Sequence, residues 1–214
     1  MDRRALLAAA RVLLASLVGV AIVAQLAQSS DAGTLVPLNF ASYFTIQSNV
    51  IGLVVFLVGA ARWRGPSTPG WDLVRGASAL NLTVTYVVFA LLLSNTDVDV
   101  ALPWVNTVVH TIFPLAAIVD WLIDPPAAPI SWARGLRWLA YPLLWLGYTM
   151  VRGAIAGWYP YPFLDPADGG YGTVALYVVA ILVLGLVVVA VLRFAGNALQ
   201  ERRLIPAATG TSAG

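Results

Sequence analysis

Apolar residues in this sequence gather in six long windows that short polar segments separate. The windows cover residues 5–28, 40–61, 76–94, 101–123, 136–154 and 173–194. Each is close to the roughly 20 residues that a helix needs to cross a bilayer. The segments between them, such as 62–72 and 124–135, are rich in Gly, Pro, Asp and Arg, which is typical of turns. The pattern predicts an all-α, polytopic membrane protein, a bundle of six transmembrane helices with short loops.

The six windows leave no stretch long enough for a soluble domain. We therefore expect one transmembrane domain over residues 1–204 and a disordered cytoplasmic tail over 205–214. The first window follows Arg3 and Arg4, as the apolar part of a signal peptide would. Its apolar run is longer than such a segment, and no small-x-small cleavage motif is evident near Gln28. We interpret it as a retained span.

The arginines are distributed unevenly over the two sides of the predicted bundle. Of the 12 basic residues, all but Arg152 lie near the start of the chain, in the second or fourth loop, or after the sixth span. The opposite loops hold Asp31, Asp97, Asp99, Asp165 and Asp168. Because basic residues favour cytoplasmic loops, this distribution predicts that both termini lie in the cytoplasm.

Composition supports the membrane class and excludes several others. Hydrophobic residues make up 60% of the chain and charged residues 10%, with a mean hydropathy of +0.83. The absence of cysteine excludes disulfides, thiolate metal centres and cysteine nucleophiles. Every basic residue is arginine, which, with the many Ala, Val, Gly and Leu residues, suggests a bacterial plasma membrane protein. A net charge of +2 is too small to indicate nucleic-acid binding.

Polar residues inside a span are functional candidates, because a bilayer tolerates them poorly. In the second span, helical periodicity places a polar stripe on one face. The stripe consists of Thr45, Ser48, Asn49, Gly52 and Phe56. Gly52 lets a neighbouring helix approach closely.

The fourth span holds the only histidine of the chain. Asn106 and His110 are four residues apart, so they share one helix face. Pro114 removes an amide donor and is expected to free a carbonyl near His110. Asp120 lies deeper and off this stripe, where we expect it to pair with Arg134 or Arg137.

The fifth span aligns Tyr148 and Arg152 with Tyr141 and Trp145 on one face. Arg152 falls in the outer third of the span, at a depth compatible with Thr45 and His110. It can either bind a substrate carboxylate or phosphate, or anchor the helix end by reaching toward the interface. The aromatic and proline-rich segment that follows, 157–166, can cap a cavity.

These residue types favour ester chemistry over metal or cofactor chemistry. A threonine hydroxyl such as that of Thr45 becomes a nucleophile when a base takes its proton, and histidine suits that role near neutral pH. Zinc catalysis needs about three His or carboxylate ligands, and one histidine cannot ligate a haem from both sides. We therefore expect no metal and no cofactor. The candidate residues for substrate orientation or oxyanion binding are Asn49, Asn106, Tyr148 and Arg152.

Three motifs occur in order along the chain: F-T-I-Q-S-N at 44–49, W-V-N-x-x-x-H-T-x-x-P at 104–114, and G-W-Y-P-Y-P-F-L-D at 157–165. They resemble the androgen-induced-gene family, which includes the androgen-dependent TFPI-regulating protein and bacterial six-span relatives. The best-characterised animal members are intramembrane threonine hydrolases that cleave fatty acid esters of hydroxy fatty acids. The resemblance implies an intramembrane threonine hydrolase with Thr45 and His110 at the catalytic positions. Arg152 has no counterpart in that family. The loops are shorter than in animal members, and the substrate is not carried over.

The sequence therefore predicts a six-helix bundle that hydrolyses a lipid-like ester entering from the outer leaflet. Thr45 is the expected nucleophile and His110 the expected general acid and base. The alternative is a non-catalytic membrane protein that binds a lipid or small molecule, or regulates a partner protein, through the same polar stripe. A transporter is less favoured, because the two halves of the chain show no clear internal repeat.

Overall fold

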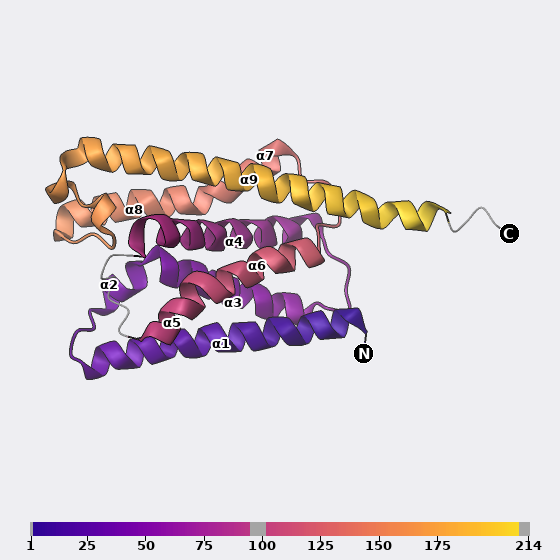
Figure 1. The fold of residues 1–214 in the computed structure, drawn as a ribbon, viewed down its shortest axis with the longest axis horizontal. Helices are drawn as coiled ribbons and strands as arrows, with labels where there is room; N and C mark the ends of the chain where they lie inside the picture. Colours follow the sequence, from indigo (N-terminus) through magenta and orange to yellow (C-terminus); the bar gives the residue numbers. More distant parts are fainter. Residues whose placement is uncertain (1, 95–101, 210–214) are drawn as a thin grey trace.

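The computed structural model describes residues 2–94 and 102–209, with side chains as far as Arg202. Every regular element in these residues is helical. The elements are α1 (Arg3–Asp31), α2 (Pro37–Ser42), α3 (Phe44–Ala61), α4 (Pro69–Val88), η1 (Phe89–Leu93), α5 (Pro103–Thr107), η2 (Val108–Ile112), α6 (Phe113–Ile123), α7 (Trp132–Leu136), η3 (Arg137–Leu139), α8 (Ala140–Ala156), η4 (Pro162–Leu164), η5 (Pro166–Asp168) and α9 (Gly170–Thr209). The long helices run along one axis, and the start of α1 and the end of α9 lie at the same end of the bundle (Figure 1).

Among the residues that the structure describes, five helices are long and apolar enough to cross a membrane, and they match five of the six predicted windows. They cover Arg3–Asp31, Phe44–Ala61, Pro69–Leu93, Pro103–Ile123 and Gly170–Arg202. The third and fourth of them continue through the π-helical segments η1 and η2. The described residues thus form an all-helical bundle with several helices of the length and composition typical of a membrane-embedded protein.

The remaining window, 136–154, corresponds to α8, which has 17 residues and is about 26 Å long. That length is slightly below the roughly 30 Å of the hydrocarbon core. At its C-terminal end, Gly157 adopts a left-handed conformation with φ of 65° and stops the helix. α7 and η3 precede α8 directly, so the helical path begins at Trp132. The predicted tail, 205–214, overlaps the end of α9, and 210–214 lie outside the described residues.

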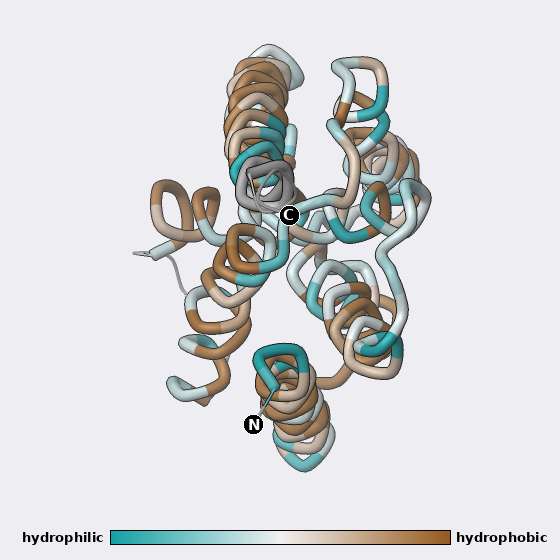
Figure 2. Tube along the Cα trace, turned by 90° about the vertical axis from the view of Figure 1, so that its right-hand side faces the viewer, coloured by the Kyte–Doolittle hydropathy of each residue, from teal (hydrophilic) through white to brown (hydrophobic). Residues whose placement is uncertain are grey.

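Apolar side chains cover the outside of the bundle as well as its core. Leu13, Leu144 and Ile155 are between 71 and 82% exposed. Figure 2 shows hydrophobic positions on all the long helices, with hydrophilic residues concentrated in the connections at the near end. Such a surface would be unfavourable in water and is matched by lipid tails.

The predicted face of α3 is confirmed, because Thr45, Ser48, Asn49, Gly52 and Phe56 are all buried. The predicted close approach at Gly52 is also confirmed. A Cβ at this position would lie 2.7 Å from a ring carbon of Phe113 and 2.8 Å from a methyl of Leu82. α3 therefore packs tightly between α4 and α6.

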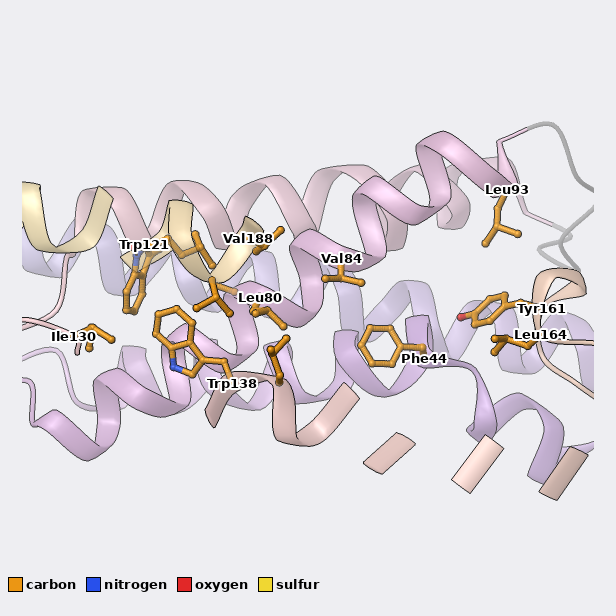
Figure 3. Close-up of a cluster of buried hydrophobic side chains, with 14 of the residues drawn as sticks. Phe44, Leu80, Val84, Leu93, Trp121, Ile130, Trp138, Tyr161, Leu164 and Val188 are labelled. Atoms are coloured by element: carbon orange, nitrogen blue, oxygen red, sulfur yellow. Dashed lines mark hydrogen bonds between the residues drawn. The ribbon is translucent and has the colours of Figure 1, made fainter. Parts of the chain in front are cut away.

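The larger hydrophobic cluster runs the length of the bundle between α4, α8 and α9 (Figure 3). One end holds Trp121, Trp138 and Ile130, and the other holds Tyr161, Leu164 and Leu93. Phe44 lies near the second end, next to Thr45 in the chain. The cluster thus extends from the end of the bundle that holds Trp121 to the end that holds Tyr161.

Candidate active site

Thr45 lies at the start of α3, where the chain changes direction. Tyr43 is extended, with φ of −64° and ψ of 128°, and separates α2 from α3. Thr45 is therefore in the first turn, whose N–H groups have no acceptor within the helix. Its N–H donates instead to the Tyr161 hydroxyl oxygen at 3.2 Å. The break at Tyr43 thus brings the Thr45 backbone and side chain to the same partner.

His110 is brought into hydrogen-bond distance of Thr45. Its Nε2 lies 3.2 Å from Thr45 Oγ1, and the two residues are 4% and 7% exposed. The other ring nitrogen, Nδ1, lies 3.2 Å from the backbone oxygen of Asn106 and 2.6 Å from its Oδ1. A carbonyl oxygen only accepts, so Nδ1 carries the proton and Nε2 is free to accept from the Thr45 hydroxyl. This is the arrangement that a histidine base requires.

The π-helical segment η2 explains how His110 and Asn49 are positioned. Within it, the Phe113 N–H bonds to the Val108 oxygen, five residues back. The next bond of that pattern would run from residue 114 to Val109, but Pro114 has no N–H. Asn49 Nδ2 replaces it, donating to the Val109 oxygen at 3.0 Å and to the Thr45 oxygen at 2.8 Å. The expected free carbonyl is therefore the one next to His110, and Asn49 connects it to Thr45.

Tyr161, from the loop between α8 and α9, completes the polar chain. Its hydroxyl lies 3.2 Å from Thr45 Oγ1 as well as from the Thr45 N–H. Since the Thr45 hydroxyl donates to His110, the Tyr161 hydroxyl donates to Thr45 Oγ1. Burial raises the pKa of the Tyr161 phenol above its ordinary value, which keeps this donor protonated. The four residues form one directed chain from Tyr161 through Thr45 and His110 to Asn106.

Phe89 fixes the plane of the histidine. Its ring stacks on the His110 ring with centroids 4.0 Å apart and an interplanar angle of 14°. Phe89 begins η1, so the contact joins two π-helical segments of neighbouring helices. Such segments widen a helix locally and often occur at functional sites. The stacking covers one face of the imidazole and leaves Nε2 directed at Thr45.

An apolar cavity of about 110 Å³ reaches Thr45 and Tyr161. Its walls come from α4, α8, α9 and the loop that holds Tyr161, with side chains such as Val84, Leu146 and Ile181. It also contacts Leu143 and Leu182, which are 50% and 38% exposed on the outside of the bundle. The cavity therefore connects Thr45 with the exposed surface between α8 and α9.

The other predicted site residues divide into two groups. Asn49 and Asn106 lie beside Thr45 and His110, but the Asn49 amide donors are both used by backbone oxygens. Tyr148 and Arg152 contact α2 or its flank instead: the Tyr148 hydroxyl lies 2.9 Å from Ser42 Oγ, and Arg152 donates to Asn39. Neither has a hydrogen bond to the Thr45 and His110 pair among the residues that the structure describes.

The prediction that Asp120 pairs with a loop arginine is wrong. Asp120 binds Arg11 through two contacts of 2.6 and 3.1 Å, and Arg75 through one of 3.1 Å. Arg134 donates to a backbone oxygen, that of Pro69. The error arises because loop arginines are nearer in the sequence, whereas Arg11 and Arg75 face Asp120 from inside α1 and α4. As expected, Asp120 is at the opposite end of the helix from His110.

Comparisons with protein-family models, with curated proteins and with solved structures found no match to this chain. The resemblance to the androgen-induced-gene family therefore rests on the three sequence motifs. Two of these motifs contain Thr45 and His110, and the third contains Tyr161. The structure brings one residue from each motif into a single hydrogen-bonded chain.

Proposed function

We propose that this protein is an intramembrane hydrolase of a lipid-like carboxylic ester. The observation that carries the proposal is the chain of hydrogen bonds that leaves His110 Nε2 as an acceptor 3.2 Å from Thr45 Oγ1, beside an apolar cavity. A purely structural threonine would bond to a backbone oxygen of its own helix, as Thr83 and Thr107 do. Thr45 instead bonds to a potential base and a potential donor.

In the proposed reaction, Thr45 Oγ attacks the ester carbonyl carbon while His110 Nε2 takes the hydroxyl proton. The developing oxyanion lies beside the first turn of α3, where the helix dipole and the Tyr161 hydroxyl favour negative charge. The carbon–oxygen bond to the alcohol then breaks, and the protonated Nε2 gives its proton to the leaving oxygen. Water, deprotonated by His110, cleaves the acyl-threonine and regenerates the Thr45 hydroxyl.

The cavity supports an acyl chain as the part of the substrate that is bound. Its lining is almost entirely aliphatic or aromatic, which matches hydrocarbon and not a charged group. The exposed residues Leu143 and Leu182 at its rim would face lipid tails, so an ester can enter sideways from the bilayer. The same lining would also suit the non-catalytic alternative, a lipid-binding protein.

We also propose that the chain spans a bacterial plasma membrane six times, with both ends in the cytoplasm. Supporting observations are the helical path from Trp132 to Ala156 and the position of the start of α1 and the end of α9 at one end of the bundle (Figure 1). The arginine distribution agrees with that orientation. Thr45 and His110 then lie toward the outer leaflet.

The test is labelling of the purified protein in detergent with a fluorophosphonate, which reacts with activated hydroxyls. Wild type and Thr45→Ser should react, whereas Thr45→Ala and His110→Ala should not. Thr107→Ala is the matched control, because Thr107 lies one turn from His110 in the sequence but bonds only to the Pro103 oxygen. Absence of labelling in wild type, together with no turnover of a panel of lipid esters, would favour the lipid-binding alternative.

A further inference from the structure

A second pocket lies at the opposite end of the bundle from Thr45. It has a volume of about 280 Å³ and is formed by the start of α1, the connection between α3 and α4, and the connection between α6 and α7. It shares no lining residue with the apolar cavity. Its lining includes three arginines, two tryptophans and one carboxylate: Arg4, Arg11, Arg62, Trp63, Trp71 and Asp124.

The charges around this pocket are not balanced. Arg11 is paired with Asp120 and Asp124 and forms the inner wall. Arg4 and Arg62 are exposed and form no ion pair with any residue that the structure describes. The Arg62 guanidinium packs over the Trp71 ring, 5.6 Å from its centroid. The one carboxylate in the lining, Asp124, pairs with Arg11, so Arg4 and Arg62 face a partly enclosed space without an ion-pair partner among the described residues.

We propose that this pocket binds the phosphate of an anionic phospholipid headgroup. Arginine donors match the oxygens of a phosphate, and basic pockets between transmembrane helices suit anionic headgroups. Trp63 and Trp71 are of the residue type that lies at the level of lipid headgroups. Both features place the pocket at the membrane interface.

The surroundings favour a lipid over a free phosphate ion. Leu7 lines the pocket, and on the same helix Leu6 and Leu13 are 51% and 71% exposed. A lipid headgroup can therefore enter the pocket while its acyl chains lie along the apolar surface of α1. A free phosphate would use the same arginines but gain nothing from that surface.

Native mass spectrometry of the purified protein tests the proposal without reference to catalysis. Phosphatidylglycerol and phosphatidylcholine with identical acyl chains are titrated into wild type, Arg4→Gln/Arg62→Gln and Arg137→Gln/Arg202→Gln. Arg137 and Arg202 are also exposed and lie outside the pocket, so the last variant removes equal charge elsewhere. Thermal unfolding without added lipid checks that each variant is folded.

Wild type should prefer phosphatidylglycerol, and the pocket variant should bind it about thirtyfold more weakly, whereas the control variant should retain wild-type affinity. Equal binding of the two lipids by wild type, or equal losses in the two double variants, would overturn the proposal. In a competition arm, inorganic phosphate and glycerol 3-phosphate are added at millimolar concentration. Displacement of the lipid by either would show that the pocket takes free phosphate and would overturn the lipid assignment.

Discussion

The two ends of this bundle bury polar groups in different ways. At one end, Thr45 and His110 belong to a neutral chain that ends beside an open apolar cavity. At the other, Asp120 and the guanidinium groups of Arg11 and Arg75 form a buried ion-pair cluster held by several contacts on each group. The neutral chain can shift a proton with little change in its partners. The ionic cluster loses charged contacts on both arginines when Asp120 is removed, although Asp124 still pairs with each of them.

Burial of a polar residue therefore does not by itself mark a functional site. Asp120 lies in the same apolar helix as His110, but its partners are the guanidinium groups of Arg11 and Arg75. What distinguishes His110 is an acceptor nitrogen that meets a hydroxyl next to space for a substrate. The following experiments separate these two kinds of polar burial, in order of decreasing effect.

Removing the nucleophile or the base should produce the largest change. Thr45→Ala and His110→Ala should each lower ester turnover about 10⁴-fold or more, because the pair acts as one unit. The free energy of unfolding should fall by about 1 kcal/mol in Thr45→Ala, the value of a buried hydrogen bond, and by about 2 to 3 kcal/mol in His110→Ala, which also loses the ring stacking on Phe89. Turnover of lipid esters and unfolding in SDS titrations measure the two quantities. A stability loss that accounts for the whole loss of turnover would remove both residues from the chemistry.

Asp120→Ala should show the reverse behaviour. Arg11 and Arg75 would each lose a buried charged contact but keep Asp124, so the protein should be destabilised by about 2 to 3 kcal/mol. The rate per folded molecule should remain close to that of wild type. Asp31→Ala is the control, because Asp31 is exposed at the end of α1. If the folded fraction of Asp120→Ala proved inactive, the two ends of the bundle would have to be coupled.

Tyr161→Phe should lower kcat about 100-fold with little change in KM, since it removes a donor to the reacting oxygen but no packing area. Tyr148→Phe is matched in chemistry but removes a bond to Ser42 only, and it should leave kcat within about threefold of wild type. Steady-state kinetics on the same ester decide the comparison. Equal losses in the two variants would mean that Tyr161 has no special role.

The smallest effect concerns pH. The pKa of the Tyr161 phenol is raised by burial, so the folded state keeps the proton when the unfolded state ionises. The stabilisation is complete below about pH 10 and is lost as pH rises further, by at most about 1.4 kcal/mol per pH unit. The difference in unfolding free energy between wild type and Tyr161→Phe, measured from pH 8 to 11, isolates this residue. A difference that stays constant over that range would contradict the raised pKa.

The features that depend on residue spacing within one helix could be predicted from the sequence. The buried face of α3, the close approach at Gly52 and the alignment of Asn106 with His110 all follow from residues spaced three or four apart. The depth of Thr45 and His110 in their helices also made their meeting possible to foresee. Local spacing was sufficient for these features.

Features that depend on contacts between distant segments were missed. Tyr161 comes from a loop whose path no periodicity determines, and only its aromatic and proline-rich composition indicated that it covers a cavity. Phe89 was missed because the π-helical turn that directs it at His110 has no clear sequence signal. The partners of Asp120 were assigned from sequence proximity, although the three-helix packing decides them.

The π-helical segment at Val108–Ile112 has a consequence for the whole of the helix that contains it. The wider turn determines how far the part of the helix after Ile112 is rotated about the helix axis relative to the part before Val108. Removal of a single residue there would rotate the following part by about 100°. His110 could then keep facing Thr45 only if Asp120 turned away from Arg11 and Arg75. Insertions and deletions should therefore be selected against in these five residues far more strongly than substitutions on their lipid-facing side.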